Sequence, residues 1–357
     1  MSRFINRAAL ALGALATAIA FTVPARAADV VLLPNGLMEP TTKEQTAPNQ
    51  FKKAPPWRIG VSFPGVGNTW IVQLFQEMKY EASLHKEIKD FTIVEANWTP
   101  AKQVADVEDL ITKKVDLIIF SPISIAEGAP LLEKIVKAGI PVVELSGKTA
   151  GQPTTMLGAG GEVFGHQGGE FLRKVLNGKG NIWAFRGVAG SDEETWRYDG
   201  FRKALAGSDI KITHEVFGDW NYAKGKKLCE NLVLSGDPVD GIWFSGAEMT
   251  RACLDVFKEN GKALVPMTGE GNNGFLRIWK QTGVKSVAPL FTPALGAAVV
   301  RASVALLEGK QLYKSYFSDP APIVQSDLDK YYRPDLNDAY WVPSALPEAK
   351  LKELFHR

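Results

Sequence analysis

Short apolar segments alternate with amphipathic helical patterns along most of this chain, and this alternation constrains the fold more than any other feature. Residues 58–63 (Arg-Ile-Gly-Val-Ser-Phe) and 116–120 (Asp-Leu-Ile-Ile-Phe) are short, apolar and bounded by polar residues, as buried strands are. Residues 69–85 and 100–113 repeat apolar side chains at helical spacing. Strands that are apolar throughout indicate a parallel sheet that helices cover on both faces.

The order of these segments predicts two α/β units. The first combines strands and helices at 58–63, 69–85, 91–96, 100–113, 116–120, 126–138 and 141–145. After about Gly160 the alternation restarts, with strands predicted at 181–185, 210–216, 241–244, 263–268 and 286–290. Helices are predicted between them at 164–176, 193–205, 222–235, 249–260 and 273–282, and a last helix at 295–308. Because parallel strands need crossover connections, we expect two doubly wound parallel-sheet domains.

Residues 1–27 have the pattern of a cleaved signal peptide. Arg3 and Arg7 form a positive start, residues 8–23 are apolar, and Ala25-Arg26-Ala27 is a small-x-small cleavage site. The apolar run is short for a span of ~20 residues, which disfavours the alternative of a membrane anchor. We therefore expect export to the periplasm. The proline-rich stretch that follows, 28–57, is expected to form an extended N-terminal arm.

Charge and composition exclude several classes of protein. The formal charge of +2 gives no basic surplus for nucleic-acid binding. No Cys/His cluster has zinc spacing, so we expect neither a metal nor a cofactor, and whether Cys229 and Cys253 form a disulfide stays open. Export also removes the chain from the cell's nucleotide cofactors. With no G-x-S-x-G motif or similar nucleophile context, we do not expect an enzyme.

Ligands of doubly wound sheets bind beyond the carboxyl ends of the strands. The loops at these ends are rich in Gly, Ser, Trp and acidic residues, for example at 64–69, 187–195, 218–221 and 269–272. If the two domains face each other, these loops line one cleft.

Short motifs at and between these loops occur in a characteristic order. They are Asn68-Thr69-Trp70-Ile71, Pro100 to Gln103, Asp116 to Pro122, Ala138 to Val143, Gly187 to Ser191, Arg197 to Phe201, Asp219-Trp220 and Glu248-Met249. Over about residues 58–309 the chain thereby resembles the periplasmic substrate-binding proteins of the ribose/galactose type, which supply ABC importers. Sugar-responsive repressors share that fold, but they begin with a helix-turn-helix where this chain has a signal peptide and an arm.

The resemblance implies a type I periplasmic binding protein fold with a hinge of three segments. The N-terminal lobe would comprise residues 58–159 and 291–319, and the C-terminal lobe with its tail residues 160–290 and 320–357. The chain would cross between the lobes near Gly160, Leu290 and Asp319. A sugar or polyol would bind between the lobes, and the permease of an ABC importer would recognise the closed monomer.

The resemblance also indicates ligand-binding residues. Asn68, Trp70 and Ile71 match the family's first-loop element, and Arg197 matches its hydroxyl-clamping arginine. Each has a local alternative, such as helix capping by Asn68 or an ion pair of Arg197 with Glu193.

Three further candidates come from the second unit. Asp219 and Trp220 match the family's acid-aromatic pair, and Glu270 matches an acid in a glycine-flanked turn. The alternatives are a helix cap at Asp219, a hydrophobic staple at Trp220 and a solvent-exposed acid at Glu270.

Other positions depart from the family pattern. Ser146 and Gly147 replace an acid and an arginine, Leu290 replaces a glutamine, and Ala247 replaces an acid for which Glu248 could compensate. Since buried groups left without partners are costly, we expect a ligand other than plain ribose. It could be another sugar, a polyol or a derivative with an apolar or charged part, and Trp98 and Trp196 are further candidates to contact it.

Three questions stay open at this level. The same site would serve a periplasmic sensor or chemoreceptor subunit, or a binder of a non-sugar polar solute. The role of the arm is also open, as is that of the tail from Tyr331 through Trp341, which could pack across the C-terminal lobe or act as a lid.

Overall fold

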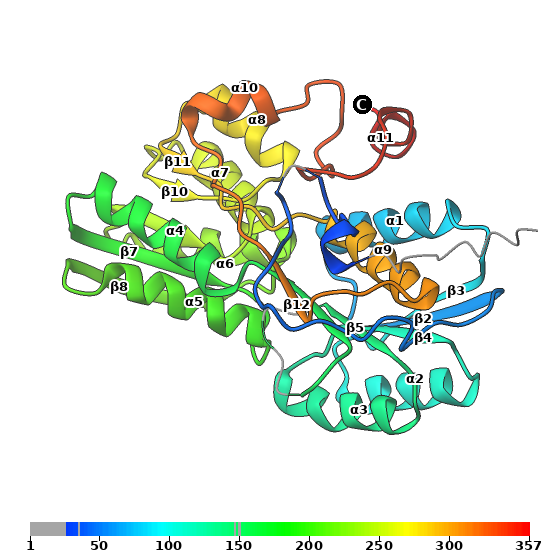
Figure 1. Ribbon diagram of the computed structural model, residues 1–357. Helices are drawn as coiled ribbons and strands as arrows, with labels where there is room; N and C mark the ends of the chain where they lie inside the picture. Colours follow the sequence, from blue (N-terminus) through cyan, green and yellow to red (C-terminus); the bar gives the residue numbers. More distant parts are fainter. Residues whose placement is uncertain (1–25, 35, 146–147, 149–150) are drawn as a thin grey trace, which may run out of the picture.

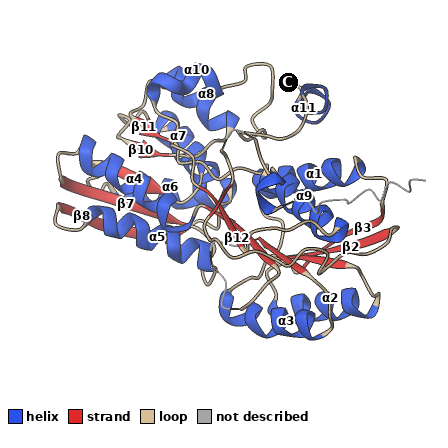
Figure 2. Cartoon of the chain, in the orientation of Figure 1, coloured by secondary structure: helices blue, strands red, loops and turns tan. Residues whose placement is uncertain are grey.

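Two parallel sheets, each flanked by helices, form the body of the molecule (Figures 1 and 2). The computed structural model describes residues 26–34, 36–145, 148 and 151–357. Most of the expected signal peptide and Ser146 lie outside these residues. We call the parts built on the two sheets the first and second lobes. The lobe boundaries given above stay a prediction.

The first lobe contains a sheet that has seven strands within the described residues, in the order β1-β12-β6-β5-β4-β2-β3. Its parallel strands are β2 (Trp57–Phe63), β3 (Ile88–Glu95), β4 (Leu117–Phe120), β5 (Val142–Leu145), β6 (Thr155–Ala159) and β12 (Ser315–Ser318). The short β1 (Glu39–Pro40) pairs antiparallel with β12. Helices α1 (Thr69–Ser83) and α9 (Leu295–Glu308) cover one face, and α2 (Pro100–Thr112) and α3 (Ile125–Lys137) cover the other.

Strand β4 explains why this lobe has two cores. Leu117 and Ile119 pack with Leu74 of α1, while Ile118 and Phe120 pack with Leu110 of α2. Successive side chains of a strand point to opposite faces, so an apolar strand feeds both cores. This confirms the parallel sheet expected from 116–120.

The second lobe has a sheet in the order β11-β10-β9-β7-β8. Its strands, all parallel, are β7 (Lys179–Arg186), β8 (Asp209–Phe217), β9 (Gly241–Phe244), β10 (Met267–Thr268) and β11 (Ser286–Val287). The helices are α4 (Gly161–Val175), α5 (Asp192–Leu205), α6 (Tyr222–Ser235), α7 (Ala247–Glu259) and α8 (Asn273–Thr282). On one face Trp243 of β9 stacks on Phe201 of α5, with ring centroids 4.5 Å apart.

The chain passes between the two sheets three times within the described residues: after β6, after β11 and after β12. Helix α9 packs against α1, β4 and β5, so it belongs with the first sheet although it follows β11 in sequence. The strands expected at 263–268 and 286–290 are shorter, and β6, β12 and β1 were not predicted.

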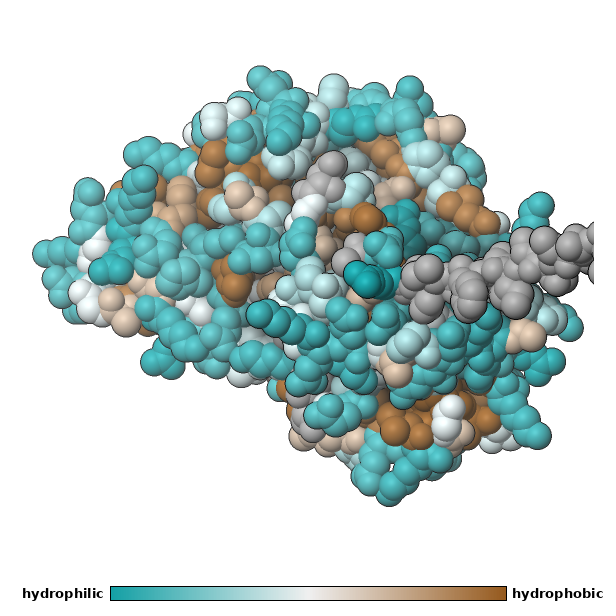
Figure 3. All heavy atoms as spheres, in the orientation of Figure 1, coloured by the Kyte–Doolittle hydropathy of each residue, from teal (hydrophilic) through white to brown (hydrophobic). Residues whose placement is uncertain are grey.

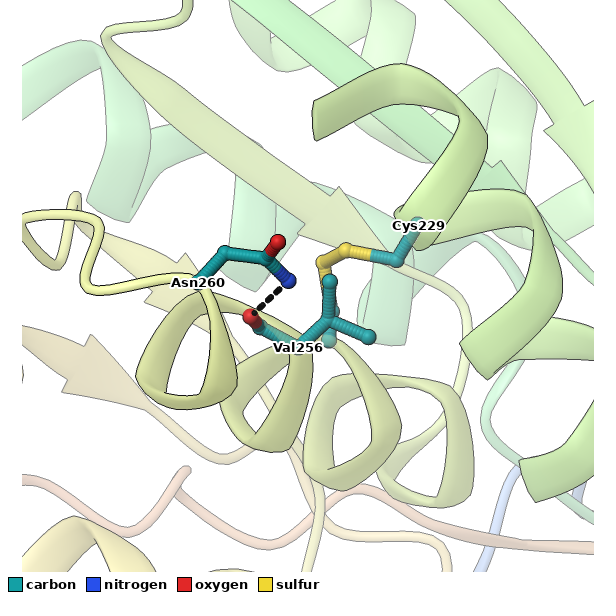
Figure 4. The surroundings of a disulfide bond; sticks show 4 residues. Cys229, Val256 and Asn260 are labelled. Carbon is teal, nitrogen blue, oxygen red and sulfur yellow. Dashed lines mark hydrogen bonds between the residues drawn. A yellow bond between two sulfur atoms is a disulfide. The ribbon is translucent and has the colours of Figure 1, made fainter. Parts of the chain in front are cut away.

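A disulfide between Cys229 and Cys253 joins α6 to α7 (Figure 4). The two Cα atoms lie 5.4 Å apart, within the range that a disulfide spans. Beside it, the Asn260 side chain donates a hydrogen bond of 2.9 Å to the Val256 carbonyl. Because the bridge closes a loop across 24 positions, the chain-entropy account gives it about 3 kcal/mol of stabilisation.

The arm and the tail both pack on the body. In the arm, Leu32 and Leu33 are buried, and the Arg301 guanidinium of α9 donates to the Leu32 carbonyl at 3.1 Å. The tail holds two short helices, α10 (Leu328–Tyr331) and α11 (Glu348–Phe355). Polar side chains cover most of the face in Figure 3. Within the described residues no helix is long and apolar enough to cross a membrane.

Candidate functional site

A cavity of about 140 Å³ lies where the carboxyl ends of the strands of both sheets meet. One water needs about 10–15 Å³ of such volume, so the cavity has room for a small organic molecule. The first lobe lines it with the loops after β2 and β4 and with Leu145 and Ala159. The second lobe contributes the first turns of α5 and α7 and the loops after β8, β10 and β11.

Capping side chains fix the helices that begin at this end of the sheets. Asn68, Ser124, Asn221 and Asn272 each accept a hydrogen bond from the backbone N–H three residues on. Such caps satisfy donors that the first helical turn leaves free. The Asn68 amide nitrogen has no hydrogen-bond partner among the described residues, so Asn68 both caps α1 and presents donors at the cavity.

Aromatic rings form much of the lining. Trp70 stacks on Phe291 with ring centroids 4.6 Å apart and planes 7° from parallel, and its indole N–H donates to the Phe291 carbonyl at 2.6 Å. The Trp220 indole N–H donates to the Ser245 carbonyl at 2.9 Å. Trp98 and Trp196, named above as further candidates, also line the cavity. Since their indole N–H groups are occupied, Trp70 and Trp220 are held in fixed orientations.

Arg197 is the cationic side chain of the described lining. Its Nε donates to Glu193 at 2.7 Å and its Nη1 to the Ser245 carbonyl at 2.6 Å, and the guanidinium lies 3.9 Å from the Phe164 ring centroid. The Nη2 group has no hydrogen-bond partner among the described residues. The planar guanidinium suits paired hydroxyls or a carboxylate.

Two glycines place Arg197 at the cavity. A Cβ on Gly165 of α4 would lie 1.7 Å from the Arg197 carbonyl oxygen, and one on Gly200 of α5 would lie 1.9 Å from the Glu162 carbonyl oxygen. Only glycines permit so close a crossing of α4 and α5. This crossing places the start of α5 at the carboxyl end of the second sheet, where Glu193 and Arg197 line the cavity.

Acidic side chains line the same cavity. Burial raises the pKa of Glu270 to about 7, although the Arg197 guanidinium at 3.9 Å opposes the rise. Glu248 accepts a hydrogen bond of 2.5 Å from the Thr69 hydroxyl, and Asp192 accepts one from the Ile125 backbone N–H. Among the described lining residues four acids, Asp192, Glu193, Glu248 and Glu270, accompany one cation, Arg197.

The hydrogen bonds accepted by Glu248 and Asp192 also connect the two lobes beside the cavity. Thr69 and Ile125 begin helices of the first lobe, whereas Glu248 and Asp192 begin helices of the second. Since neighbouring loops of both lobes are within hydrogen-bond distance, the structure represents a closed arrangement.

Most of the predicted site residues come together in this cavity. Those that line it are Asn68, Trp70, Ile71, Arg197, Trp220, Glu248 and Glu270. Their contact with a ligand stays a prediction. Asp219 and Leu290 are not among the lining residues, and Ser146 lies outside the described residues.

The structure explains the positions of the two residues outside the lining. Asp219 pairs with Lys224 at 2.5 Å, and the cap of α6 is Asn221, so the alternative role of Asp219 as a helix cap was wrong. The Leu290 side chain packs against the turn at Gly271: a Cβ added to Gly271 would lie 2.8 Å from Leu290 Cδ2.

Sequence reasoning missed several lining residues. Phe291 directly follows Leu290 at a crossing between the lobes, and Trp341 belongs to the tail. Asp192 and Glu193 also line the cavity; they lie in the loop 187–195 expected at the cleft, but neither was named as a ligand-binding residue. An aromatic residue next to a predicted crossing was a usable signal for Phe291. Nothing local marked Trp341. No group of three or more metal-ligating side chains is found within the described residues.

Comparisons with known proteins agree with this architecture. The sequence matches the periplasmic binding protein domain over residues 59–311. The ribose import binding protein RbsB of Bacillus subtilis is 24% identical over 258 residues, covering 72% of this chain and 84% of that protein. The xylitol-binding protein of Mycolicibacterium smegmatis is 28% identical over 185 residues, covering 49% of this chain and 51% of that protein.

Solved structures show the same fold. An ABC transporter solute-binding protein from Thermobispora bispora superposes with a TM-score of 0.74 at 23% identity, covering 83% of this chain and 94% of that chain. A solute-binding protein from Bacillus halodurans with bound myo-inositol has a TM-score of 0.69 at 21% identity, covering 78% and 98%.

Proposed function

Because the chain belongs to the periplasmic binding protein family, we propose that it captures a sugar or sugar-like polyol between its lobes and delivers it to the permease of an ABC importer. The protein acts in the periplasm as a monomer and binds its ligand without chemical change. The signal-peptide pattern of residues 1–27 supports the location, and the family, which consists of binding proteins, supports binding over catalysis.

One observation carries this proposal: indole rings of both lobes meet a guanidinium and carboxylates of the second lobe at one cavity. Aromatic faces cover the C–H surfaces of a sugar ring, and planar charged groups bind hydroxyls in pairs. Trp70 comes from the first lobe, and Trp220 and Arg197 come from the second. A ligand that bridges the lobes therefore receives its full set of contacts only in the closed form.

The charged side chains of the lining indicate which ligands the cavity binds. Asp192, Glu193, Glu248 and Glu270 supply acceptors, against the single guanidinium of Arg197 within the described lining. A neutral polyol or a cationic derivative satisfies these acceptors, whereas an anion meets repulsion. Relatives named for ribose and xylitol, and a neighbour with bound myo-inositol, support the hydroxylated class. A sensor role is not favoured, because the relatives named here are import or solute-binding proteins.

A thermal-shift screen tests the proposal. The full chain without its signal peptide is melted alone and with ribose, arabinose, allose, xylitol and myo-inositol, together with amino acids and nucleosides as comparison classes. We expect the melting temperature to rise with at least one sugar or polyol in a saturable manner, because a ligand that binds only the folded state stabilises it. A rise with amino acids or nucleosides alone would contradict the sugar assignment.

A further inference from the structure

The C-terminal tail contributes Trp341 to the described lining of the cavity, although this residue lies beyond the matched family region of residues 59–311. We propose that Trp341 is a specificity-determining residue for the ligand, a role that rests on the function proposed above. Trp341 lines the cavity while only 2% of its surface is exposed. Its indole is therefore part of the built wall.

The backbone of Trp341 is fastened to both lobes. On the first lobe, the Gln73 side chain of α1 accepts from the Trp341 N–H at 2.8 Å and donates to its carbonyl at 3.0 Å. On the second lobe, Trp341 forms an antiparallel bridge with Asn272, and the Val342 N–H donates to the Gly271 carbonyl at 2.8 Å. The tail thus runs between α1 and the turn that carries Glu270.

The indole ring is fixed as firmly as the backbone. Its N–H donates to the Thr69 hydroxyl at 2.8 Å, and that hydroxyl donates to Glu248 at 2.5 Å. This chain of hydrogen bonds leads from the tail through the first lobe to an acid of the second lobe that lines the cavity. With its N–H directed at Thr69, the ring has one orientation relative to the cavity.

Contacts on either side keep the tail from acting as a loose lid. Before Trp341, the Asn273 side chain donates to the Arg333 and Leu336 carbonyls at 2.8 and 2.9 Å. After it, Glu77 of α1 accepts from the Ser344 hydroxyl at 2.5 Å and from the Ala345 N–H at 3.2 Å. A wall held in this way selects ligands by shape, because it does not move aside for a larger molecule.

The test compares two tryptophans in matched surroundings. Trp341→Phe replaces the indole that lines the cavity with a smaller ring. Trp279→Phe is the control: Trp279 is also buried and donates one indole hydrogen bond, to Gln325 at 2.8 Å, but it does not line the cavity. Calorimetric titration uses each sugar and polyol that raises the wild-type melting temperature. We expect Trp341→Phe to weaken the tightest ligand roughly tenfold and to change the order of preference. Trp279→Phe should keep the wild-type order.

A second experiment needs no ligand. Both native cysteines are in the disulfide, so Trp341→Cys and Trp279→Cys each introduce a single free thiol. A small methanethiosulfonate reagent should modify Cys at 341 faster than at 279, because only position 341 borders the cavity. Equal rates would overturn the inference, as would unchanged ligand preferences in Trp341→Phe. If no sugar or polyol stabilises the wild type, the proposed function has failed, and the labelling rates still decide whether position 341 borders the cavity.

Discussion

At the scale of single residues, Arg197 concentrates the chemistry of the cavity. It is almost fully buried, and its charge is balanced by Glu193 at 2.7 Å and Glu270 at 3.9 Å. A buried charge requires partners and hydrogen bonds to persist. Aromatic rings also face it, with Phe291 at 4.9 Å and Trp220 at 5.7 Å from the guanidinium carbon to the ring centroids. The local ion pair expected on α5 exists, and the same side chain lines the cavity.

Arg197→Lys tests this residue. An ammonium cannot reproduce the planar guanidinium that reaches Glu193, Ser245 and the cavity together, so we expect ligand affinity to fall by about 100-fold. The matched control is Arg186→Lys: Arg186 donates to Glu194 at 2.6 and 3.0 Å and faces the Tyr198 ring, but it is not among the lining residues. Both variants are titrated with the ligand found by thermal shift. Equal losses in the two variants would argue against a ligand role for Arg197.

At the scale of elements, the tail and α1 form a unit that the repeating α/β pattern did not contain. Glu77 of α1 is buried and accepts hydrogen bonds from Ser344 and Ala345 of the tail. Burial raises the pKa of Glu77 to about 7, and the hydrogen bonds from Ser344 and Gln73 oppose this rise. The attachment of the tail therefore contains a group that titrates near neutral pH.

Glu77→Gln should flatten the pH dependence of stability. In the unfolded chain the pKa returns to about 4.5, so between about pH 4.5 and 7 the folded protein holds a proton that the unfolded chain has lost. The free energy of unfolding therefore falls as pH rises through this window, by up to roughly 3 kcal/mol from this group. Urea unfolding at about pH 5 and about pH 8 measures the fall, which should be smaller in the variant.

Glu133→Gln is the surface control for this experiment. Glu133 is exposed on α3, and Lys137 lowers the pKa of its carboxyl, so it titrates below the window. In this control the free energy of unfolding should differ between the two pH values by as much as it does in the wild type. An equally large difference in Glu77→Gln would show that other buried carboxyls, such as Glu270, cause the pH dependence.

At the scale of the whole molecule, two lobes close over one cavity. The hydrogen bonds from Thr69 to Glu248 and from Ile125 to Asp192 join helix starts of opposite lobes, and Asn221 reaches the Gly67 carbonyl at 3.5 Å. Together with the contacts of Trp341 to both lobes, these polar contacts hold the lobes in the closed arrangement. We expect a ligand that touches both lobes to add to the free energy of closing, because only the closed form gives it both sets of contacts.

Small-angle scattering should detect this closure. We expect the free protein in solution to have a larger radius of gyration than the protein saturated with the ligand identified by thermal shift, because the three crossings between the lobes allow a hinge motion. Arg197→Lys at the same ligand concentration should stay close to the free form. Identical scattering with and without saturating ligand would mean that the lobes do not open.

The sequence by itself determined the fold class, most helices and the central strands, because apolar periodicity acts over a few neighbouring residues and needs no distant partner. The family resemblance of the sequence also indicated Trp70, Arg197, Trp220 and Glu270, and all four line the cavity. Only the tertiary structure decided the end of the first sheet formed by β1, β12 and β6, because β12 pairs with β1 and β6 across long stretches of sequence. It alone brought Trp341 to the cavity, because that position depends on a tail that returns to α1 through contacts with residues some 270 positions away.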